Sequence, residues 1–404
     1  MRAALERRKV DGSRLDEVIA LDARRRELLP ELEAMRATQN SASERIGQAK
    51  RGGEDASTAI AEMKEVAAGV KAMQAELTAA EEALRASMIA LPNLADESAP
   101  AEDEVLREVG EAGATGRDHL ELLDGLVDME AGARVSGSRF AYLKGPLVML
   151  ELALVRWALE KLDGHGFTPV IPPVLVREEA LFGTGFLPDT EQQLYHLPED
   201  DLYLVGTSEV PLASLHAGEI MGELPLRYAG FSPCFRREAG AAGRDTRGIF
   251  RVHQFDKVEM FAFVAPDQST EEHERLLSIE EELLAELEIP YRVVSIAAWD
   301  LGASATKKYD LEAWLPGQGR YRELTSCSNT TDFQARRLDV RHRPGGSGSP
   351  EHVHTLNGTA VAIGRTIIAL AENGQQEDGS VRIPAALHAY GAPESIRAPV
   401  NDLP

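Results

Sequence analysis

The chain has 404 residues, 43% of them hydrophobic, which is enough to bury the cores of about two or three domains. A formal net charge of −23 excludes a surface generally suited to coating nucleic acid, so any such contact must use local basic patches. No apolar run is long enough to span a membrane, and the charged start, MRAALERRKV, predicts no secretory signal. With only two cysteines, Cys234 and Cys327, we expect a cytoplasmic protein with reduced, buried thiols, no disulfide framework and no zinc.

The N-terminal part predicts two long helices joined by a short turn. Apolar residues recur three or four positions apart over residues 15–46, and a second series over residues 60–88 is close to heptad spacing. The segment KRGGEDAS between them supplies a Gly-Gly turn and offers Ser57 as an N-cap. Helices of roughly thirty residues would fold back on each other as an antiparallel coiled-coil hairpin about 45 Å long. Such a hairpin would serve as a dimerisation rod or as an arm that reaches a distant partner.

A domain boundary is predicted shortly after the second helix. Pro92-Asn93 ends that helix, and an acidic, Ala/Gly-rich linker follows from about Ala95 to Gly116. We therefore predict an N-terminal arm over residues 1–95 and a larger domain over residues 96–404.

The larger domain begins with elements that suit a subunit contact. A helix is predicted over residues 147–162, followed by a strand in FTPVIPPVLV, residues 167–176. Pro172 and Pro173 cannot donate hydrogen bonds to a central ladder, so this strand belongs at an edge. Further on, LYLVGTSEVP predicts a strand that runs into a turn presenting Thr207, Ser208 and Glu209.

Residues 228–264 predict a β-hairpin with two different faces. Two strand-like runs flank a loop that contains Gly240, Gly243 and Gly248. On the first strand Arg236 and Glu238 share a face, opposite Phe231 and Phe235. On the second strand, one face carries Arg251, His253, Phe255, Lys257 and Glu259. The other face is apolar and is predicted to join the core through Phe250, Val252, Val258, Met260 and Val264.

The polar face of this hairpin has the chemistry of a nucleotide site. Guanidinium groups grip phosphate oxygens in pairs, aromatic rings stack on bases, and carboxylates accept hydrogen bonds from exocyclic amines. The sequence contains no G-x-x-x-x-G-K-[ST] motif, so a nucleotide would be held on a sheet by arginines. The alternative is an exposed hairpin whose charged residues pair with one another.

The remaining elements favour an antiparallel α+β sheet over a doubly wound parallel one. They are an amphipathic helix over residues 271–287, strands at 291–296 and 309–315, the segment RELTSCSNTTDFQARR and a Gly-rich, disordered-looking insert at 344–350. The last is LNGTAVAIGRTIIALAENGQQ, a strand and a helix with Ile363, Ile367 and Leu370 inward and Arg365 off that face.

Together these segments resemble the bacterial-type seryl-tRNA synthetases, which are class II aminoacyl-tRNA synthetases. The similarity rests on FRREAG, GRDTRG and RVHQFDKVEMF in the hairpin, on NGTAVAIGRTIIALAEN, on the Thr-Ser-Glu turn, on ELTSCSNTTDFQARR and on the two-helix arm. All lie in the family's order over nearly the whole chain. The resemblance implies an antiparallel β-sheet flanked by helices, preceded by an antiparallel coiled-coil arm.

The resemblance also implies an activity. Members of the family activate L-serine with ATP and Mg²⁺ to give seryl-adenylate, and then transfer serine to the 3′ end of tRNA(Ser). Charging of tRNA(Sec) stays open. The implied partners are the long variable arm of the tRNA, contacted by the hairpin, and a second copy of the chain in a homodimer.

Residue by residue, the resemblance implies a nucleotide site. Arg236 would hold the α-phosphate and Arg365 the β- and γ-phosphates, and both are expected to be catalytic together with Glu323. Glu238 would read the adenine amino group, and Phe255 would stack on the ring. Glu323 and Ser326 would hold Mg²⁺. The full set expected to bind ATP is Arg236, Arg237, Glu238, Phe255, Glu323, Leu324, Thr325, Ser326 and Arg365.

A neighbouring set of residues is expected to hold serine. Thr207 and Glu209 would receive the ammonium group, and Glu259 and Thr359 would meet the hydroxyl. The full set is Thr207, Ser208, Glu209, Glu259, Asn357 and Thr359. Because charge stabilisation suffices for attack on a phosphate, no general base is required, and we expect His253 to be a structural hydrogen-bonding residue.

The sequence departs from the family pattern at several points. It begins inside what resembles the first arm helix, Thr359 stands where serine is commoner, and Gly374 stands where a larger residue is common. Two alternatives to a serine–tRNA ligase remain open. One is a paralogue that loads serine onto a non-tRNA acceptor, and the other is a non-catalytic coiled-coil scaffold. The full arm argues against the first, and the intact set of Arg236, Glu238, Glu323 and Arg365 argues against the second.

Overall fold

A computed structural model describes residues 1–53, 55–188, 193–239, 245 and 247–399. Contacts between Cα atoms divide the chain into two compact units, Met1–Pro92 and Asn93–Pro404. No helix among the described residues is both long and apolar enough to cross a membrane. Both cysteines are free and buried, as predicted, in strands of the second unit.

The first unit is a pair of long helices preceded by a short one, α1 (Arg2–Arg7). Helix α2 (Gly12–Gly52) begins where the Asp11 carboxylate accepts from the Ser13 N–H, and it ends at Gly53 in the left-handed region, at φ 74°. Helix α3 (Ser57–Ile89) follows. The predicted N-cap at Ser57 is wrong. Ser57 is already the first helical residue, and its N–H donates to the Asp55 carboxylate at 2.9 Å.

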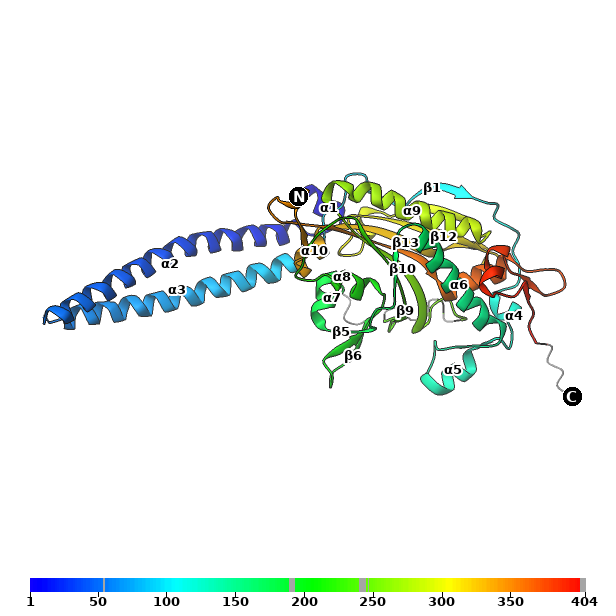
Figure 1. The fold of residues 1–404 in the computed structure, drawn as a ribbon, viewed down its shortest axis with the longest axis horizontal. Coiled ribbons are helices and arrows are strands. Elements are labelled where there is room, and N and C mark those ends of the chain that lie inside the picture. Colours follow the sequence, from blue (N-terminus) through cyan, green and yellow to red (C-terminus); the bar gives the residue numbers. More distant parts are fainter. Residues whose placement is uncertain (54, 189–192, 240–244, 246, 400–404) are drawn as a thin grey trace. The chain divides into compact units, whose positions relative to one another are not determined.

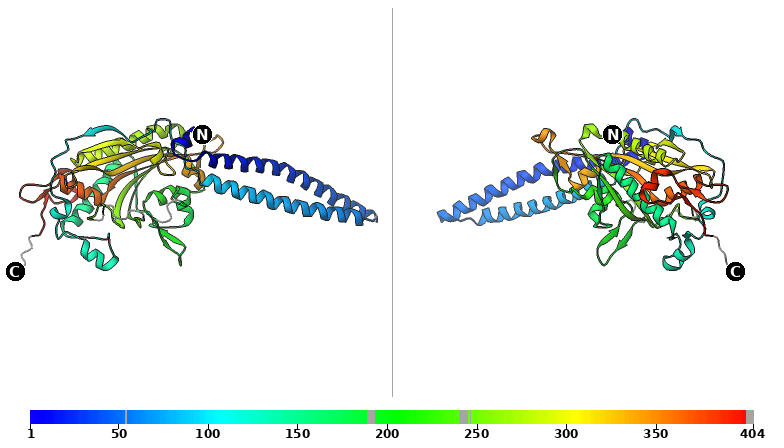
Figure 2. Two further views of the ribbon diagram at one scale, coloured as in Figure 1. Left: turned by 180° about the vertical axis from the view of Figure 1, so that it is seen from behind. Right: turned by 45° about the vertical axis from the view of Figure 1, so that its right-hand side comes forward.

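Helices α2 and α3 lie side by side from every viewing direction (Figures 1 and 2), which confirms the predicted hairpin arm. Their shared core contains Leu28, Leu32, Leu77 and Ala80. An ion pair between Arg24 and Glu76 also joins the two helices. The helices have 41 and 33 residues, so α2 is longer than predicted and spans about 60 Å.

An eight-stranded sheet organises the second unit (Figure 1). Neighbouring strands are antiparallel except for β4, which runs parallel to β9, so the predicted antiparallel-rich α+β fold is confirmed. The strand order is β1 (Glu104–Val109), β11 (Tyr291–Ser295), β12 (Lys307–Leu315), β13 (Arg320–Thr331), β16 (His354–Ala362), β10 (Gln254–Val264), β9 (Leu226–Phe235) and β4 (Thr168–Val170).

Strand β1 corrects the predicted linker. Residues 104–109 lie inside the segment assigned to a linker, yet they pair with β11 at the edge of the sheet. Every residue of β1 is exposed, so the strand has no buried face to impose an apolar alternation on the sequence.

The hydrophobic core covers one face of this sheet. Val258, Met260, Ala262 and Val264 of β10 join one buried cluster. That cluster also contains side chains of α6 (Pro146–Gly164), α9 (Ser269–Glu286) and α11 (Ile363–Asn373). The predicted alternation therefore holds along β10, and it leaves the odd-numbered residues on the opposite face.

Smaller elements surround the sheet. Strand β4 is an edge strand, as predicted for this segment, but Pro172 and Pro173 follow it instead of lying within it. The segment expected to look disordered contains a 3₁₀ turn at Pro344–Gly346. Near the site lie α7 (Glu178–Thr184), α8 (Glu209–Ser214) and α10 (Phe333–Leu338), and the three-stranded sheet of β5 (Leu175–Val176), β7 (Leu202–Leu204) and β6 (Tyr195–Leu197). The others are α4 (His119–Leu122), β2 (Val127–Asp128), α5 (Met129–Ser136), β3 (Tyr142–Leu143), β8 (Ile220–Met221), β14 (Arg341–His342), β15 (Glu351–His352), β17 (Val381–Arg382), β18 (Ser395–Ile396) and further 3₁₀ turns at Pro266–Gln268, Ala298–Asp300 and Ala385–Tyr390.

Candidate active site

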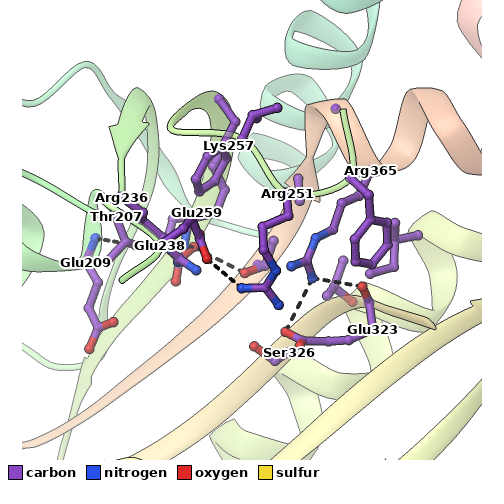
Figure 3. A pocket seen from close by; sticks show the side chains of 18 of the residues that line it. Thr207, Glu209, Arg236, Glu238, Arg251, Lys257, Glu259, Glu323, Ser326 and Arg365 are labelled. Atoms are coloured by element: carbon purple, nitrogen blue, oxygen red, sulfur yellow. Dashed lines mark hydrogen bonds and ion pairs between the residues drawn. The ribbon is translucent and has the colours of Figure 1, made fainter. Parts of the chain in front are cut away.

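A cavity of about 160 Å³ lies on the polar face of the sheet, over β10, β13 and β16 (Figure 3). It gathers all but two of the residues expected to bind ATP or serine. The predicted residues in its lining are Thr207, Glu209, Arg236, Glu238, Phe255, Glu259, Glu323, Leu324, Thr325, Ser326, Asn357, Thr359 and Arg365.

The other two predicted residues lie elsewhere. The Ser208 side chain is fully buried and donates to the Gly230 carbonyl at 3.3 Å, so it points away from the cavity. Arg237 follows Arg236 on the chain and is absent from the described lining. Thr325 lines the cavity, but its hydroxyl donates at 2.8 Å to Glu280. The Nδ1 atom of His253 lies 2.9 Å from the Arg236 carbonyl oxygen, which is a structural contact.

The hairpin is shorter than its sequence predicts. Strand β9 ends at Phe235 and β10 begins at Gln254, so Arg236 and Glu238 lie beyond the ladder. The loop glycines Gly240 and Gly243 lie outside the described residues, whereas Gly248 has a φ of 74°. Period-two alternation does not apply outside the strands. For this reason Phe250 and Val252, predicted to belong only to the core, also line the cavity.

Arginines meet at the nucleotide end of the cavity. Arg365 donates to the Glu323 carbonyl at 2.8 Å, and Arg236 donates to the Gly206 carbonyl at 3.2 Å. Burial lowers the pKa of Arg365, and the positive charges of Arg236 and Arg251 lower it further. Because these guanidinium groups repel one another, an anion with several charges would relieve the repulsion. The cluster is therefore suited to a polyphosphate.

Aromatic rings lie against the same arginines. The Arg236 guanidinium lies 5.2 Å from the ring centre of Phe255. Arg322 and Arg365 lie 3.9 Å and 4.6 Å from the ring centre of Phe250. These cation–π contacts hold planar groups in place beside the cavity. A flat aromatic base could stack in the same environment.

Glu323 and Ser326 supply oxygen ligands beside the arginines. Burial alone would raise the pKa of Glu323, but the nearby charges of Arg365, Lys308 and Arg236 outweigh burial and hold that pKa below its usual value. An ionised carboxylate and a hydroxyl suit a hard cation such as Mg²⁺. No group of three or more His, Cys, Asp or Glu side chains in the described part of the chain could hold a metal by itself. A magnesium ion here would need additional ligands, and phosphate oxygens are the usual ones.

Acidic and amide side chains form the other end of the cavity. Glu209 accepts from Gln334 at 2.8 Å and from Asn357 at 3.1 Å. Burial, followed by the nearby charge of Glu259, raises the pKa of Glu209 to about 7. This buried carboxyl is therefore poised to exchange a proton, or to receive an ammonium group, near neutral pH.

Glu259 lies at the same end and is also paired. It forms an ion pair with Lys257 and accepts from the Thr359 hydroxyl at 3.4 Å. Glu259 thus pairs with another charged residue of the hairpin, as the alternative to a ligand site expected, but it is buried and also lines the cavity. Because Lys257 and Glu259 are almost fully buried, neither charge is neutralised by water.

Sequence reasoning did not assign Arg251, Lys257 or Glu280 to the site. Arg251 and Lys257 line the cavity, and the alternation of the second strand had already placed both on its polar face. Arg251 donates to Glu238 at 2.5 Å. Nothing in the sequence predicted that Glu280 of α9 is buried, because a glutamate on an amphipathic helix normally faces water. In the structure it is fully buried beneath the sheet, where burial raises its pKa well above the usual value.

Comparison with known proteins defines the class first. A family model described as the tRNA synthetase class II core domain (G, H, P, S and T) matches residues 194–374, which include the whole cavity lining apart from Phe186. The model of the seryl-tRNA synthetase N-terminal domain matches residues 1–95. The second unit is therefore a class II synthetase core.

Individual relatives narrow the class further. The chain is 50% identical to a serine–tRNA ligase of Thermobifida fusca, over 96% of this chain and 94% of the relative. It is 51% identical to a serine–tRNA ligase of Micrococcus luteus over the same shares. A seryl-tRNA synthetase from Pyrococcus horikoshii, solved in complex with ATP, superposes with a TM-score of 0.93 at 41% identity, covering 99% of this chain and 97% of that one. The chain belongs to the seryl-tRNA synthetase family, as its motifs predicted.

Proposed function

We propose that this protein is a serine–tRNA ligase, which activates L-serine with ATP to seryl-adenylate and transfers serine to the 3′ end of tRNA(Ser). The observation that carries the proposal is the single cavity described above, which joins an arginine cluster to a buried acidic pocket. The first end suits a triphosphate and the second suits an ammonium group and a hydroxyl. Those are the groups that ATP and serine present.

The arrangement accounts for the first step of the reaction. The serine carboxylate must attack the α-phosphate, which brings two anions together. Arg236 and Arg365 come from different parts of the chain, and each is held in place by a backbone carbonyl of the protein itself. Cations fixed in this way lower the barrier by positioning the reactants and stabilising charge, with little proton transfer.

Mg²⁺ fits the proposed site. Glu323 would contribute a carboxylate oxygen and Ser326 a hydroxyl, and both lie in the cavity lining beside Arg365. When bound, the ion would neutralise phosphate charge and fix the orientation of the triphosphate.

The amino-acid pocket would recognise serine by its polar groups. Glu209 and Thr207 would hold the ammonium group, with Asn357 and Gln334 fixing the Glu209 carboxylate. Glu259 and Thr359 would meet the hydroxyl. Alanine lacks the hydroxyl and would lose the contacts with Glu259 and Thr359, so we expect it to be rejected.

The remaining proposals concern partners and place of action. The two-helix arm would contact the long variable arm of tRNA(Ser), and the second unit would pair with a second copy of the chain in a homodimer. An enzyme that charges tRNA would act in the cytoplasm, where two free cysteines stay reduced.

Serine-dependent ATP–pyrophosphate exchange, measured beside tRNA(Ser) charging, tests the function. Both reactions are expected. Exchange without charging would indicate a paralogue with another acceptor, and loss of both would indicate a scaffold. Arg236→Ala and Arg365→Ala should each slow exchange by about a hundredfold, or about 3 kcal/mol, and lysine should rescue little because it lacks the planar fork. Arg320→Ala, which removes an exposed arginine of β13, is the matched control. Near-normal exchange in either cavity variant would contradict the assigned phosphate contacts.

A further inference from the structure

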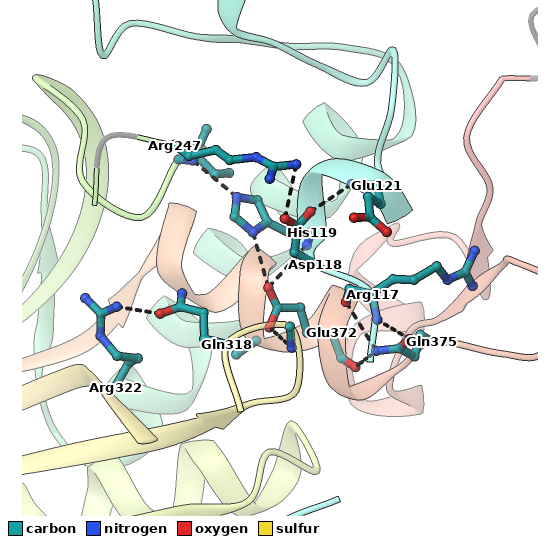
Figure 4. A network of polar contacts seen from close by, with 12 residues as sticks. Arg117, Asp118, His119, Glu121, Arg247, Gln318, Arg322, Glu372 and Gln375 are labelled. Atoms are coloured by element: carbon teal, nitrogen blue, oxygen red, sulfur yellow. Dashed lines mark hydrogen bonds and ion pairs between the residues drawn. The ribbon is translucent and has the colours of Figure 1, made fainter. Parts of the chain in front are cut away.

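A buried histidine lies outside the cavity and joins three parts of the second unit (Figure 4). His119, the first residue of α4, is only 5% exposed. Its Nδ1 lies 3.2 Å from the carboxylate of Glu372, and its backbone N–H donates to the same oxygen at 3.2 Å. Glu372, near the end of α11, is fully buried as well.

The other ring nitrogen of His119 contacts the described end of the loop that precedes β10. The Ile249 N–H donates to Nε2 at 3.3 Å. A nitrogen that accepts a hydrogen bond carries no proton, so the imidazole proton lies on Nδ1 and is donated to Glu372. The loop leaves room for this ring only because residue 248 is glycine. A Cβ atom at Gly248 would lie 2.1 Å from Nε2.

Glu372 extends the connection to the turn between β12 and β13. Its second carboxylate oxygen accepts from the Gly317 N–H at 2.9 Å, in the turn between β12 and β13. Helix α11 carries Arg365, and β13 carries Glu323. His119 thus links the end of the hairpin loop to the two elements that present the proposed phosphate and Mg²⁺ ligands.

We propose that His119 is a positioning residue for ATP binding. By accepting from Ile249 while donating to Glu372, it fixes the C-terminal end of the loop between β9 and β10. The next two residues, Phe250 and Arg251, are in the cavity lining together with Ile249. Phe250 packs against the guanidinium groups of Arg322 and Arg365, and Arg251 holds Glu238. His119 is not part of the cavity lining and would not touch ATP, so its effect on binding would be transmitted by the backbone of the loop.

Replacing His119 with asparagine or with glutamine preserves a different one of its two side-chain hydrogen bonds. The Asn amide nitrogen reaches the position of Nδ1, so His119→Asn keeps a donor to Glu372 and loses the acceptor for Ile249. The Gln oxygen reaches the position of Nε2, so His119→Gln keeps the acceptor and loses the donor. The inference rests on the proposed function. It requires that the hydrogen bond accepted from Ile249, and not the one donated to Glu372, control ATP binding.

The test measures KM for ATP and for serine in ATP–pyrophosphate exchange, with thermal unfolding of each variant beside it. His119→Asn should raise the KM for ATP about tenfold and leave the KM for serine within about twofold, whereas His119→Gln should stay within about threefold of the parent for both. His165→Asn, which alters a histidine–carboxylate contact between α6 and α9, is the matched control and should change neither constant.

Several results would overturn the inference. Equal impairment of the Asn and Gln variants, parallel changes in both KM values, or failure of both variants to fold would reduce His119 to a general structural role. A parent with no exchange activity would instead contradict the proposed function itself, so the two failures can be distinguished.

Discussion

At the scale of single residues, Glu209 is a cavity side chain whose charge depends on its surroundings. Burial and the nearby Glu259 raise its pKa to about 7 in the folded chain, above the usual 4.5. A raised carboxyl pKa favours the folded state when the group is protonated. That contribution is fully present below pH 4.5 and is lost as the pH rises through about 7.

We therefore predict that Glu209→Gln becomes more stable relative to the parent as the pH rises from 5 to 8. The difference should approach about 3 kcal/mol at most and should vanish below about pH 4.5. Denaturant unfolding of both proteins across this range provides the measurement. The same variant should bind serine more weakly at pH 8, because it cannot present a carboxylate to the ammonium group.

Glu199→Gln provides the control, because this residue is exposed on the β6–β7 turn and has no place in the cavity lining. A stability difference for Glu209→Gln that does not change with pH would contradict the assignment of a costly buried charge.

Thr359 is predicted to help exclude threonine. Its hydroxyl contacts Glu259 at 3.4 Å, and its methyl group fills space that a family member with serine would leave open. Thr359→Ser and Thr359→Gly should raise activation of threonine relative to serine by about tenfold, the usual effect of one methyl group. Exchange assays with serine, threonine and alanine measure the ratios. If the threonine-to-serine ratio does not move, Thr359 is not part of the wall.

At the scale of elements, the sequence predicted whatever followed a regular period. The even residues of β10 from Val258 onward join the main core and Phe255, Lys257 and Glu259 line the cavity, as expected, and α6, α9 and α11 lie where their apolar spacing predicted. The odd residues further along β10, Phe261 and Phe263, join a second buried cluster. Two features broke the period. Residues 250–253 continue the sequence alternation but precede the first ladder residue of β10, Gln254. Strand β1 is exposed on both faces.

Contacts between distant segments could not be predicted in this way. Glu280 bonds to Thr325 across 45 positions, and His119 bonds to Ile249 across 130. Both residues lie on helices, where local spacing favours solvent exposure of polar side chains. Only the folded sheet determines which of them is buried.

The two-helix arm should affect tRNA charging but not serine activation. The cavity is lined entirely by described residues of the second unit. Deleting residues 25–75 and closing the gap with a glycine linker joins the helices where Arg24 and Glu76 already pair. We expect exchange to stay near the parental rate and charging to fall sharply. Charging at the parental rate would show that the arm only serves as a rod.

The tip of the arm offers a finer version of this test. Arg45, Lys50 and Arg51 are exposed near the turn. Replacing all three with alanine should weaken tRNA binding and reduce the slope of log affinity against log salt by up to about three, because each phosphate contact contributes just under one. Arg85→Ala, on the exposed side of α3 far from the turn, controls for overall charge. An unchanged slope would place the tRNA contact elsewhere.

At the scale of the whole molecule, an apolar surface on α6 predicts self-association. Met149 and Leu152 are 50% and 56% exposed, and Ile171 beyond β4 is 81% exposed. The opposite side of α6 holds Leu150 and Leu154 in the core, so the exposed residues can change without loss of the fold. Leu152→Asp combined with Ile171→Asp should convert a dimer into a monomer in sedimentation velocity at micromolar concentration.

Val135→Asp is the control, since Val135 is 69% exposed on α5 and is not one of the α6 and β4 residues that make up this surface. A parent that sediments as an active monomer would contradict the homodimer, and an unchanged dimer in the double variant would move the interface to another surface.

The position of β16 in the sheet determines the order in which parts of the chain can fold during synthesis. This strand lies between β13 and β10, although it follows β10 by about ninety residues along the chain. Until residues 354–362 have left the ribosome, β10 and β13 each present an unpaired edge to other chains. Thr359, which pairs in register with Glu259 and lines the cavity with it, takes its place at the same moment. Met1–Pro92, by contrast, is a compact unit made of consecutive residues at the start of the chain, so it can form much earlier. In a nascent chain the two-helix arm can therefore fold first, and the cavity is completed last.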